Sequence, residues 1–384
     1  MYVVKINGIA LQDFQIVYPE NTDGGYEKYL AQQLAAEIEV VCGVSVAVRN
    51  DAEAHAAHEI LVGNTNRNVS GFVGELGYDD FSVSSDGDHV VLTSKVYKGL
   101  GEAVNKFLEL VRGGEEVSIP LNNILPCKTY SAMSFNILYI YHEERWPTVV
   151  DLILKYMPDS VGLQEPERRW TAFLLENDKL REHYNVIVFP FRDGRSGTNE
   201  IILTRKDKYR IKKIATKWLS DTPDEISRFE DAALHRIVNF AKLEDKETGS
   251  CITHVNTHLD HLQETVRAKQ AKVLLNCVKE FGDETYIITG DFNTTRDCDN
   301  NPQAYPIMVT DTGLADSRYA AAYATERNTI PSDNPKVVID YCFVSESAVK
   351  VNYYHVCAET MPAQNGTMIY PSDHCAVYIA YELK

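Results

Sequence analysis

The sequence predicts an α/β protein in two parts, a small α/β domain followed by a larger one in which strands and helices alternate to the end. The chain has 384 residues, more than one domain usually holds. Hydrophobic residues make up 44% and charged residues 24%, which is the balance of a globular protein. A stretch rich in Gly, Pro and acid, residues 112–128, interrupts the pattern. We therefore expect domains at residues 1–120 and 128–384.

The first domain shows two amphipathic helices and several short strands. Apolar residues recur at helical spacing from Gly25 to Val41, and Gly43 is a typical helix stop. A second helical pattern runs from Gly99 to Val111. The expected strands are residues 44–48, 59–62, 81–83 and 89–93, the last two joined at Asp86-Gly87. No nucleophile or metal cluster is evident there, so we expect an accessory domain.

Charge and cysteine usage limit the possible functions. The net charge is −17, which argues against a basic surface for duplex DNA, although divalent cations can still bring positive charge to a phosphate. The eight cysteines form no CxxC pair, a pattern that favours free thiols in a reducing compartment. No apolar run is long enough to cross a membrane, and the N-terminus is unlike a signal peptide. We expect a cytoplasmic protein with no membrane span and no evident protein partner.

The sharpest local motif is ITGDFNTT, residues 288–295, in which an apolar strand leads to Asp291 and Asn293. These two side chains share a face because strand side chains alternate. A carboxylate can take a proton from water, and an amide can donate to a phosphate oxygen without adding negative charge. The alternative is an Asx-turn at the end of a strand.

Two further motifs place an acid near an imidazole. Asp373 and His374 lie between a Pro-Ser turn and the last apolar strand, where the alternative is a capping Asp beside a surface His. Asp340 lies inside the apolar run VVIDYCFVS. A buried carboxylate needs a partner, and a histidine is the obvious candidate.

The remaining polar positions also end strands. Glu165 follows the strand of SVGLQE, Asn136 ends SFN, and His258 lies in ITHVNTHLDH just before a helix. A lone carboxylate at a strand end suits a hard divalent cation, which prefers oxygen ligands. Each signal is weak alone, since polar residues commonly end strands.

Taken in order, these segments resemble the endonuclease/exonuclease/phosphatase superfamily, whose fold is DNase I-like. The matching order is strand-Asn, LQE, NTHLDH, GDFN, IDY and SDH, from about Tyr130 to Leu383. The run TRKDKYRIKKIATKWLSDTPDE also resembles bacterial members. The resemblance implies a two-sheet α/β sandwich flanked by helices, preceded here by the small α/β domain. That small domain loosely resembles the N-terminal domains of some glycoside hydrolases, in YEKYLAQQLAAEIEVVCG and EILVGNTNR.

The resemblance implies a role for each motif residue in a divalent-metal-dependent hydrolase of phosphoester bonds. Glu165 binds Mg²⁺ or Mn²⁺, with Asn136 and Asp373 close by. Asp291 orients or deprotonates the attacking water, and Asn293 holds a phosphate oxygen. His374, paired with Asp340, stabilises the transition state. His258 contacts the phosphate or the leaving group.

One position departs from the family pattern. Family members often carry a Glu seven residues before the Arg of the TRKD-type run, and this Glu is a partner of the histidine at the position of His258. In this sequence the same spacing from Arg205 gives Thr198. Glu200 is two residues on and faces the same way on a strand, so the partner of His258 is left open. Arg236, in AALHRIVNF, lies on a predicted strand before His254 and is a candidate phosphate contact. The basic run Arg205 to Lys217 is better explained as the solvated face of a hairpin than as a substrate-steering patch.

Two alternatives of other classes stand beside this hypothesis. A dizinc hydrolase of the metallo-β-lactamase type carries HxHxDH, but Asn256 replaces the first histidine here and is a poor zinc ligand. A non-catalytic binding protein on the same fold is disfavoured because every motif position is filled. Within the superfamily the substrate stays open between nucleic acid, lipid head groups, small phosphodiesters and sugar phosphates. The acidic charge favours a small or carbohydrate-linked phosphoester.

Overall fold

The computed structural model describes residues 3–20, 25–67, 74–139, 143–195, 197–296, 303–331 and 337–384. The chain divides into two compact units, Met1–Thr129 and Tyr130–Lys384. Seven of the cysteines are free thiols, and Cys298 lies outside the described residues. Among the helices within those ranges, none is long and apolar enough to cross a membrane.

The N-terminal unit is a small α/β layer. Its elements are β1 (Lys5–Ile6), β2 (Ile9–Ala10), η1 (Leu11–Asp13), β3 (Gln15–Tyr18), α1 (Tyr26–Cys42), β4 (Ala47–Asn50), β5 (Glu59–Val62), β6 (Asp80–Ser85), β7 (His89–Ser94), α2 (Tyr97–Arg112), β8 (Glu116–Val117) and β9 (Ile124–Pro126). The main sheet has the order β4-β3-β5-β7-β6-β9, and a smaller one has the order β2-β1-β8. Helix α1 ends at Gly43, whose φ of 65° is left-handed and therefore suits glycine.

Three features of this unit differ from the sequence expectations. The strand expected at residues 44–48 forms at Ala47–Asn50. β3 and β9 were not anticipated, and β9 pairs with β6 in the same sheet. Residues 124–126 of the expected linker are therefore part of the N-terminal sheet.

The C-terminal unit holds two larger sheets. Its elements up to residue 258 are β10 (Tyr130–Asn136), η2 (Glu143–Arg145), α3 (Trp146–Tyr156), β11 (Ser160–Gln164), α4 (Arg168–Glu176), α5 (Asp178–His183), β12 (Tyr184–Ile187), β13 (Glu200–Arg205), β14 (Tyr209–Trp218), β15 (Ile237–Asp245) and β16 (Cys251–His258). The later ones are α6 (Glu264–Phe281), β17 (Tyr286–Asp291), α7 (Ala304–Val309), β18 (Leu314–Asp316), α8 (Ser317–Ala320), β19 (Tyr323–Ala324), β20 (Asp340–Ser345), β21 (Val349–Cys357), β22 (Met361–Pro362), β23 (Met368–Ile369) and β24 (Ala376–Leu383).

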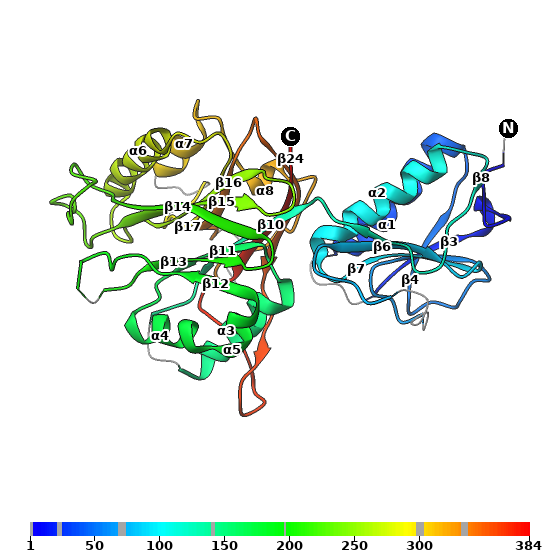
Figure 1. Ribbon diagram of the computed structural model, residues 1–384, viewed down its shortest axis with the longest axis horizontal. Helices are drawn as coiled ribbons and strands as arrows, with labels where there is room; N and C mark the ends of the chain where they lie inside the picture. The colour runs from blue at the N-terminus through cyan, green and yellow to red at the C-terminus, as the bar shows by residue number, and fades with distance from the viewer. Residues whose placement is uncertain are drawn as a thin grey trace. The chain divides into compact units, whose positions relative to one another are not determined.

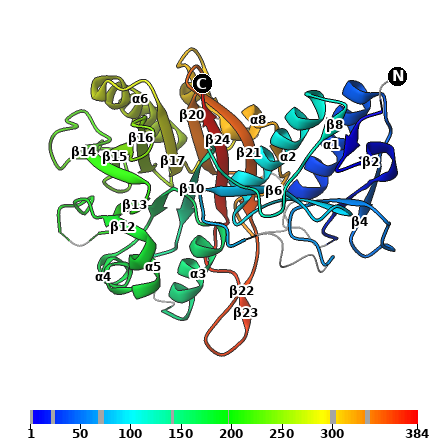
Figure 2. The same cartoon turned by 45° about the vertical axis from the view of Figure 1, so that its right-hand side comes forward.

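The two sheets pack face to face as a sandwich. One has seven strands in the order β12-β13-β11-β10-β24-β21-β19, and the other has six in the order β14-β15-β16-β17-β20-β18. Figure 2 shows β24 beside β10 and β21. Apolar side chains from both sheets form the core between them, among them Ala132, Ile202, Leu243, Ile287 and Val377. This is the DNase I-like architecture that the motif order implied.

Helices cover the outer face of each sheet (Figure 1). Leu274 of α6 and Met308 of α7 pack on Phe240 and Phe343 of the six-stranded sheet. On the other sheet, the ring of Tyr156 at the end of α3 lies 5.5 Å from that of Tyr378. The helices bury these outward-facing apolar residues.

A polar layer joins the sheets beneath the strand ends. His254 contacts Ser160 Oγ at 2.8 Å and Thr289 Oγ1 at 2.9 Å, and Gln164 donates to Asn256 Oδ1 at 2.7 Å. Gly162 leaves the room that this layer needs, because a Cβ there would lie 2.0 Å from Thr289 Oγ1. Gly162 therefore lets the two sheets approach closely next to the strand ends that carry the candidate site residues.

Candidate active site

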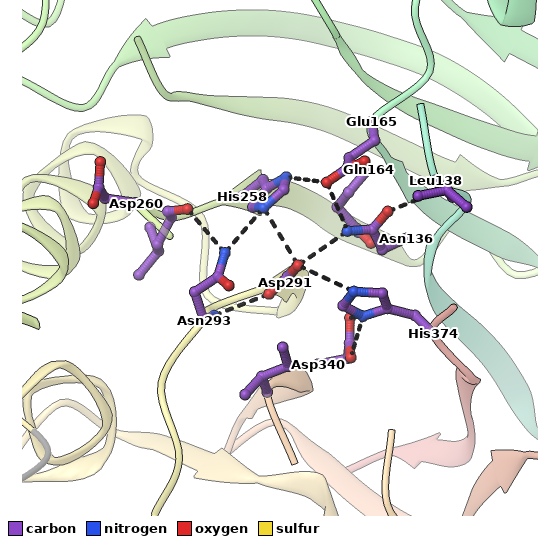
Figure 3. A network of polar contacts seen from close by, with 12 residues as sticks. Asn136, Leu138, Gln164, Glu165, His258, Asp260, Asp291, Asn293, Asp340 and His374 are labelled. Carbon is purple, nitrogen blue, oxygen red and sulfur yellow. Dashed lines mark hydrogen bonds and ion pairs between the residues drawn. The ribbon is translucent and has the colours of Figure 1, made fainter. Parts of the chain in front are cut away.

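Polar side chains from several strand ends meet at one end of the sandwich (Figure 3). Parallel pairing places His258, the last residue of β16, beside Asp291, the last of β17. Antiparallel pairing places Asp291 beside Asp340, the first of β20. The side chains joined by contacts there are Asn136, Glu165, His258, Asp291, Asn293, Asp340 and His374.

Asp291 lies at the centre of this network and is 2% exposed. Asn136 Nδ2 donates to its Oδ2 at 3.0 Å, and the backbone N–H of Asn293 donates to its Oδ1 at 2.9 Å. The His258 Nε2 atom lies 3.3 Å from Oδ2. Burial, together with the adjacent carboxylate of Asp340, raises the pKa of Asp291 to about 7. A carboxylate with this pKa can accept a proton near neutral pH.

Asp340 and His374 contact each other, as the apolar surroundings of Asp340 suggested they should. His374 Nδ1 lies 2.9 Å from Asp340 Oδ2, and its Nε2 faces Asp291 Oδ2 at 3.8 Å. Burial opposes a charge on the imidazole, but the Asp340 carboxylate outweighs it and raises the pKa of His374 to about 10. The result is an imidazolium directed at the centre of the site.

Glu165 is held at the edge of the network by a strained backbone. It follows β11 with a φ of 73°, which is uncommon for a residue other than glycine. Its Oε1 accepts from Asn136 Nδ2 at 3.2 Å and its Oε2 from the backbone N–H of Tyr139 at 3.1 Å. The Asn136 Oδ1 atom accepts from the Leu138 N–H, so the amide nitrogen faces the carboxylates.

Asp373 stands apart from the other residues predicted to form the metal site. Its side chain is exposed and its Oδ1 accepts from Ser372 Oγ at 3.2 Å. Among the contacts within the described ranges, none joins it to Glu165 or Asn136. The metal-ligand roles of these three residues remain predictions.

His258 is a neutral imidazole. Burial and the nearby guanidinium of Arg236 hold the pKa of His258 well below its usual range. Asn293 Nδ2 donates to His258 Nε2 at 3.0 Å and to the carbonyl of Leu259 at 3.2 Å. Because Nε2 accepts, the ring proton lies on Nδ1, which is 3.9 Å from Glu165 Oε1. Asn293 is therefore the hydrogen-bond partner of His258, whereas the Asp291 and Glu165 carboxylates lie nearby without a hydrogen bond to the neutral ring.

Two buried charged residues flank this network. Glu200 begins β13 opposite Gln164 and is fully buried, with no hydrogen bond recorded to either carboxylate oxygen among the described residues. Burial raises the pKa of Glu200 to about 7 against the opposing effect of Arg192 and Arg236. The Arg236 guanidinium is 2% exposed, and its Nε and Nη1 find no hydrogen-bond partner within the described ranges. The sequence indicated only strand alternation for Glu200 and a place on a predicted strand for Arg236, which in the structure immediately precedes β15.

The donor set fits a divalent cation. Carboxylate oxygens of Asp291 and Asp340 lie within 4.8 Å of each other, and Glu165 borders the same network. Asp291 and Asp340 repel each other in a buried position, a repulsion that a cation relieves. Carboxylate oxygens are the ligands that Mg²⁺ and Mn²⁺ prefer.

The dizinc alternative fails at Asn256. This residue lies in the polar layer between the sheets, where its Nδ2 donates to the carbonyls of Leu163 at 2.8 Å and Ile201 at 3.0 Å. Its side chain is fully buried and committed to the backbone. It therefore holds the sheets together and is not a metal ligand.

Comparisons with known proteins agree with the fold. The model of the Endonuclease/Exonuclease/phosphatase family matches residues 133–374. A family protein from Bacteroides thetaiotaomicron is 26% identical with a TM-score of 0.59, over 66% of this chain and 97% of its own. A mannosyl-6-phosphatase from the same species is 28% identical with a TM-score of 0.57, over 66% and 99%. A family protein from Bacteroides vulgatus is 28% identical with a TM-score of 0.59, over 67% and 99%. No curated protein matches the chain.

The two-sheet sandwich with acids and histidines at its strand ends defines a phosphoesterase. The chain belongs to the endonuclease/exonuclease/phosphatase family, and it is an enzyme that hydrolyses phosphoester bonds. The non-catalytic alternative is thereby set aside.

Proposed function

We propose that the chain is a divalent-metal-dependent phosphatase of small phosphomonoesters, with a sugar phosphate as substrate. The observation that carries this proposal is Arg236, a buried guanidinium that has two nitrogens without a partner among the described residues and interacts electrostatically with Asp291 and Glu165. A phosphomonoester carries two negative charges near neutral pH, whereas a phosphodiester carries one. A second fixed cation in addition to His374 therefore favours the monoester.

The similar mannosyl-6-phosphatase supports the same choice, since it matches 66% of this chain and 99% of its own at 28% identity. The net charge of −17 also disfavours a long polyanion such as duplex DNA. Burial lowers the pKa of Arg236 to about 10, so its guanidinium stays charged near neutral pH.

In the proposed mechanism, Glu165 would hold a divalent cation together with carboxylate oxygens of the neighbouring acids. A bound divalent cation supplies Lewis-acid stabilisation of the phosphate charge. Asp291 accepts the proton of the attacking water, since its raised pKa matches that task. Asn136 and the Asn293 N–H hold the Asp291 carboxylate in one orientation.

Fixed hydrogen-bond donors would face the phosphate as charge moves onto its oxygens. His374 is kept protonated by Asp340 and donates from Nε2, which points away from that carboxylate. His258 donates from Nδ1 because Asn293 occupies its Nε2. Donors fixed in place before the reaction are typically worth several kcal/mol in the transition state.

The test is a substrate panel assayed by phosphate release with Mg²⁺ or Mn²⁺. We expect hexose 6-phosphates to be hydrolysed faster than bis(p-nitrophenyl) phosphate or single-stranded DNA, and all activity to be lost in excess EDTA. Asp291→Asn in the same assay gives the background. Faster cleavage of the diester, or full activity in EDTA, contradicts the proposal.

Arg236→Met separates the two substrate classes in this panel. Methionine fills a similar volume without charge, so we expect kcat/KM for the monoester to fall about 100-fold and that for a diester to fall less than about 10-fold. Arg210→Met is the matched control, because Arg210 is an exposed residue of β14. Equal losses for the two substrates would show that Arg236 does not select the monoester.

A further inference from the structure

A second cluster of metal-ligating side chains lies on the outer face of the seven-stranded sheet. His355 and Cys357 are alternate residues at the end of β21 and so share one face, and Glu359 follows two residues later. His355 is 1% exposed and Cys357 2% exposed. One ligand atom of each lies within 4.8 Å of the others. We call these three residues the β21 cluster.

The β21 cluster combines three kinds of donor, an imidazole nitrogen, a thiol sulfur and a carboxylate oxygen. Zn²⁺ is the ion that binds all three, usually with four ligands in a tetrahedron. Mg²⁺ and Mn²⁺ prefer oxygen ligands and suit the Asp291 site instead. The β21 cluster therefore suits Zn²⁺, whereas the Asp291 site suits Mg²⁺ or Mn²⁺.

Tyr156, at the end of α3, supplies a fourth group. Its hydroxyl lies 2.8 Å from His355 Nε2 and donates to Glu359 Oε1. Tyr156 is fully buried, so α3 closes the cluster from the outside. Lys155 pairs with Glu359 at 3.0 Å, but its side chain is 37% exposed and can turn to solvent.

The Tyr156 hydroxyl is within hydrogen-bond reach of all three side chains, so the imidazole, the thiol and the carboxylate converge on one point. Burial raises the pKa of Cys357 well above its usual range, so the metal-free cluster holds a neutral thiol. Zinc replaces that proton, forms the Zn–S bond and releases H⁺ to solvent. Thiolate sulfur, imidazole nitrogen and carboxylate oxygen are all ligands that Zn²⁺ accepts, and a structural zinc site usually has four ligands.

We propose that His355, Cys357 and Glu359 bind one Zn²⁺, with the Tyr156 oxygen within reach as a fourth ligand. The ion joins α3 to the end of β21. Cys357 pairs with Ala376 of β24, which follows His374 by two residues. A zinc ion there stabilises the strand end from which the catalytic imidazole extends, without taking part in the reaction.

The test uses Co²⁺ as a spectroscopic substitute for zinc in the full chain, first freed of metal with EDTA. A thiolate bound to Co²⁺ gives a charge-transfer absorption that carboxylate and imidazole ligands alone do not give. We expect about one thiolate-bound Co²⁺ per chain, displaced by Zn²⁺, together with a higher Tm when zinc is present. Absence of this absorption in the wild-type chain at excess Co²⁺ overturns the proposal.

Variants assign the signal to its cysteine. Cys357→Ser should abolish the absorption. Glu359→Gln, a change at a partly exposed side chain, should weaken Co²⁺ binding at least about 10-fold and serves if the serine variant does not fold. Cys375→Ser, beside His374, and Glu165→Gln should both keep the absorption. Loss of the absorption in Cys375→Ser with retention in Cys357→Ser also overturns the proposal.

Discussion

Asp340 is fully buried and its charge is compensated by a single imidazole. Both of its carboxylate oxygens lie within 3.1 Å of His374 Nδ1, and the other ring nitrogen faces Asp291. Removing one partner of such a pair leaves the other buried without compensation, which costs more than the pair itself contributes. The two residues should therefore behave as one functional group.

This coupling is testable with three variants. We expect Asp340→Asn to reduce kcat by about 100-fold or more with little change in KM, because it keeps the shape but removes the charge. His374→Ala should cost at least as much. The double variant should lose little more than the worse single one, since each change already disables the pair. Independent, multiplying losses would contradict the pairing.

The residues of the site differ in how far the sequence could predict them. Asp291, His374 and Glu165 stand at strand ends in short motifs, so their convergence could be predicted from their order. The direction of the Asn136 amide could not, because it depends on the Leu138 N–H and on two carboxylates that other strands supply. Arg236 is buried only through the tertiary packing of its neighbours, which no local pattern indicates.

The polar layer between the two sheets makes the stability of the fold depend on pH, because it buries a histidine. His254 of β16 bridges Ser160 of β11 and Thr289 of β17 as a neutral imidazole. Burial lowers the pKa of His254 from 6.5 to about 3. Below pH 6.5 the unfolded chain binds a proton that the folded chain refuses, so stability is lost as the pH falls.

We expect His254 to account for about 2 kcal/mol of lost stability between pH 7 and pH 5. The measurement is the free energy of unfolding by urea denaturation across this range. His254→Gln keeps one donor and one acceptor but does not titrate, so its stability should fall less steeply with pH. An identical slope in both proteins would mean that His254 is protonated in the folded state.

At the level of strands and helices, periodicity predicted the long elements better than the short ones. The helices α1 and α2 and the strands β5 to β7 lie close to their expected ranges. β3 has four residues and β9 has three, too few to show an alternating pattern. Each is defined by its neighbours, β3 by β4 and β5, and β9 by β6.

The boundary between the two units lies between Thr129 and Tyr130, where the backbone hydrogen bonds pass from partners in the N-terminal unit to partners in the C-terminal unit. The N–H groups of Lys128 and Thr129 donate to Glu102 of α2, and the Cys127 N–H donates to the Asp79 carbonyl. Tyr130 opens β10 and pairs with Tyr381 of β24. A truncation that begins within residues 112–128 would therefore keep part of the N-terminal sheet without its pairing strands. A truncation that begins at Tyr130 would not.

We expect the chain Tyr130–Lys384 to fold alone and hydrolyse small phosphoesters with kcat/KM within about threefold of the full protein. Both apolar clusters of the sandwich and all eight predicted site residues lie within it. Circular dichroism, thermal unfolding and phosphate release from a hexose 6-phosphate measure the outcome, and Asp291→Asn in the same truncated chain gives the background. A chain starting at Leu121 should be less soluble, because β9 then lacks its partner β6. If Tyr130–Lys384 is soluble and cooperatively folded but inactive while the full protein works, the N-terminal unit contributes to catalysis and is more than an accessory.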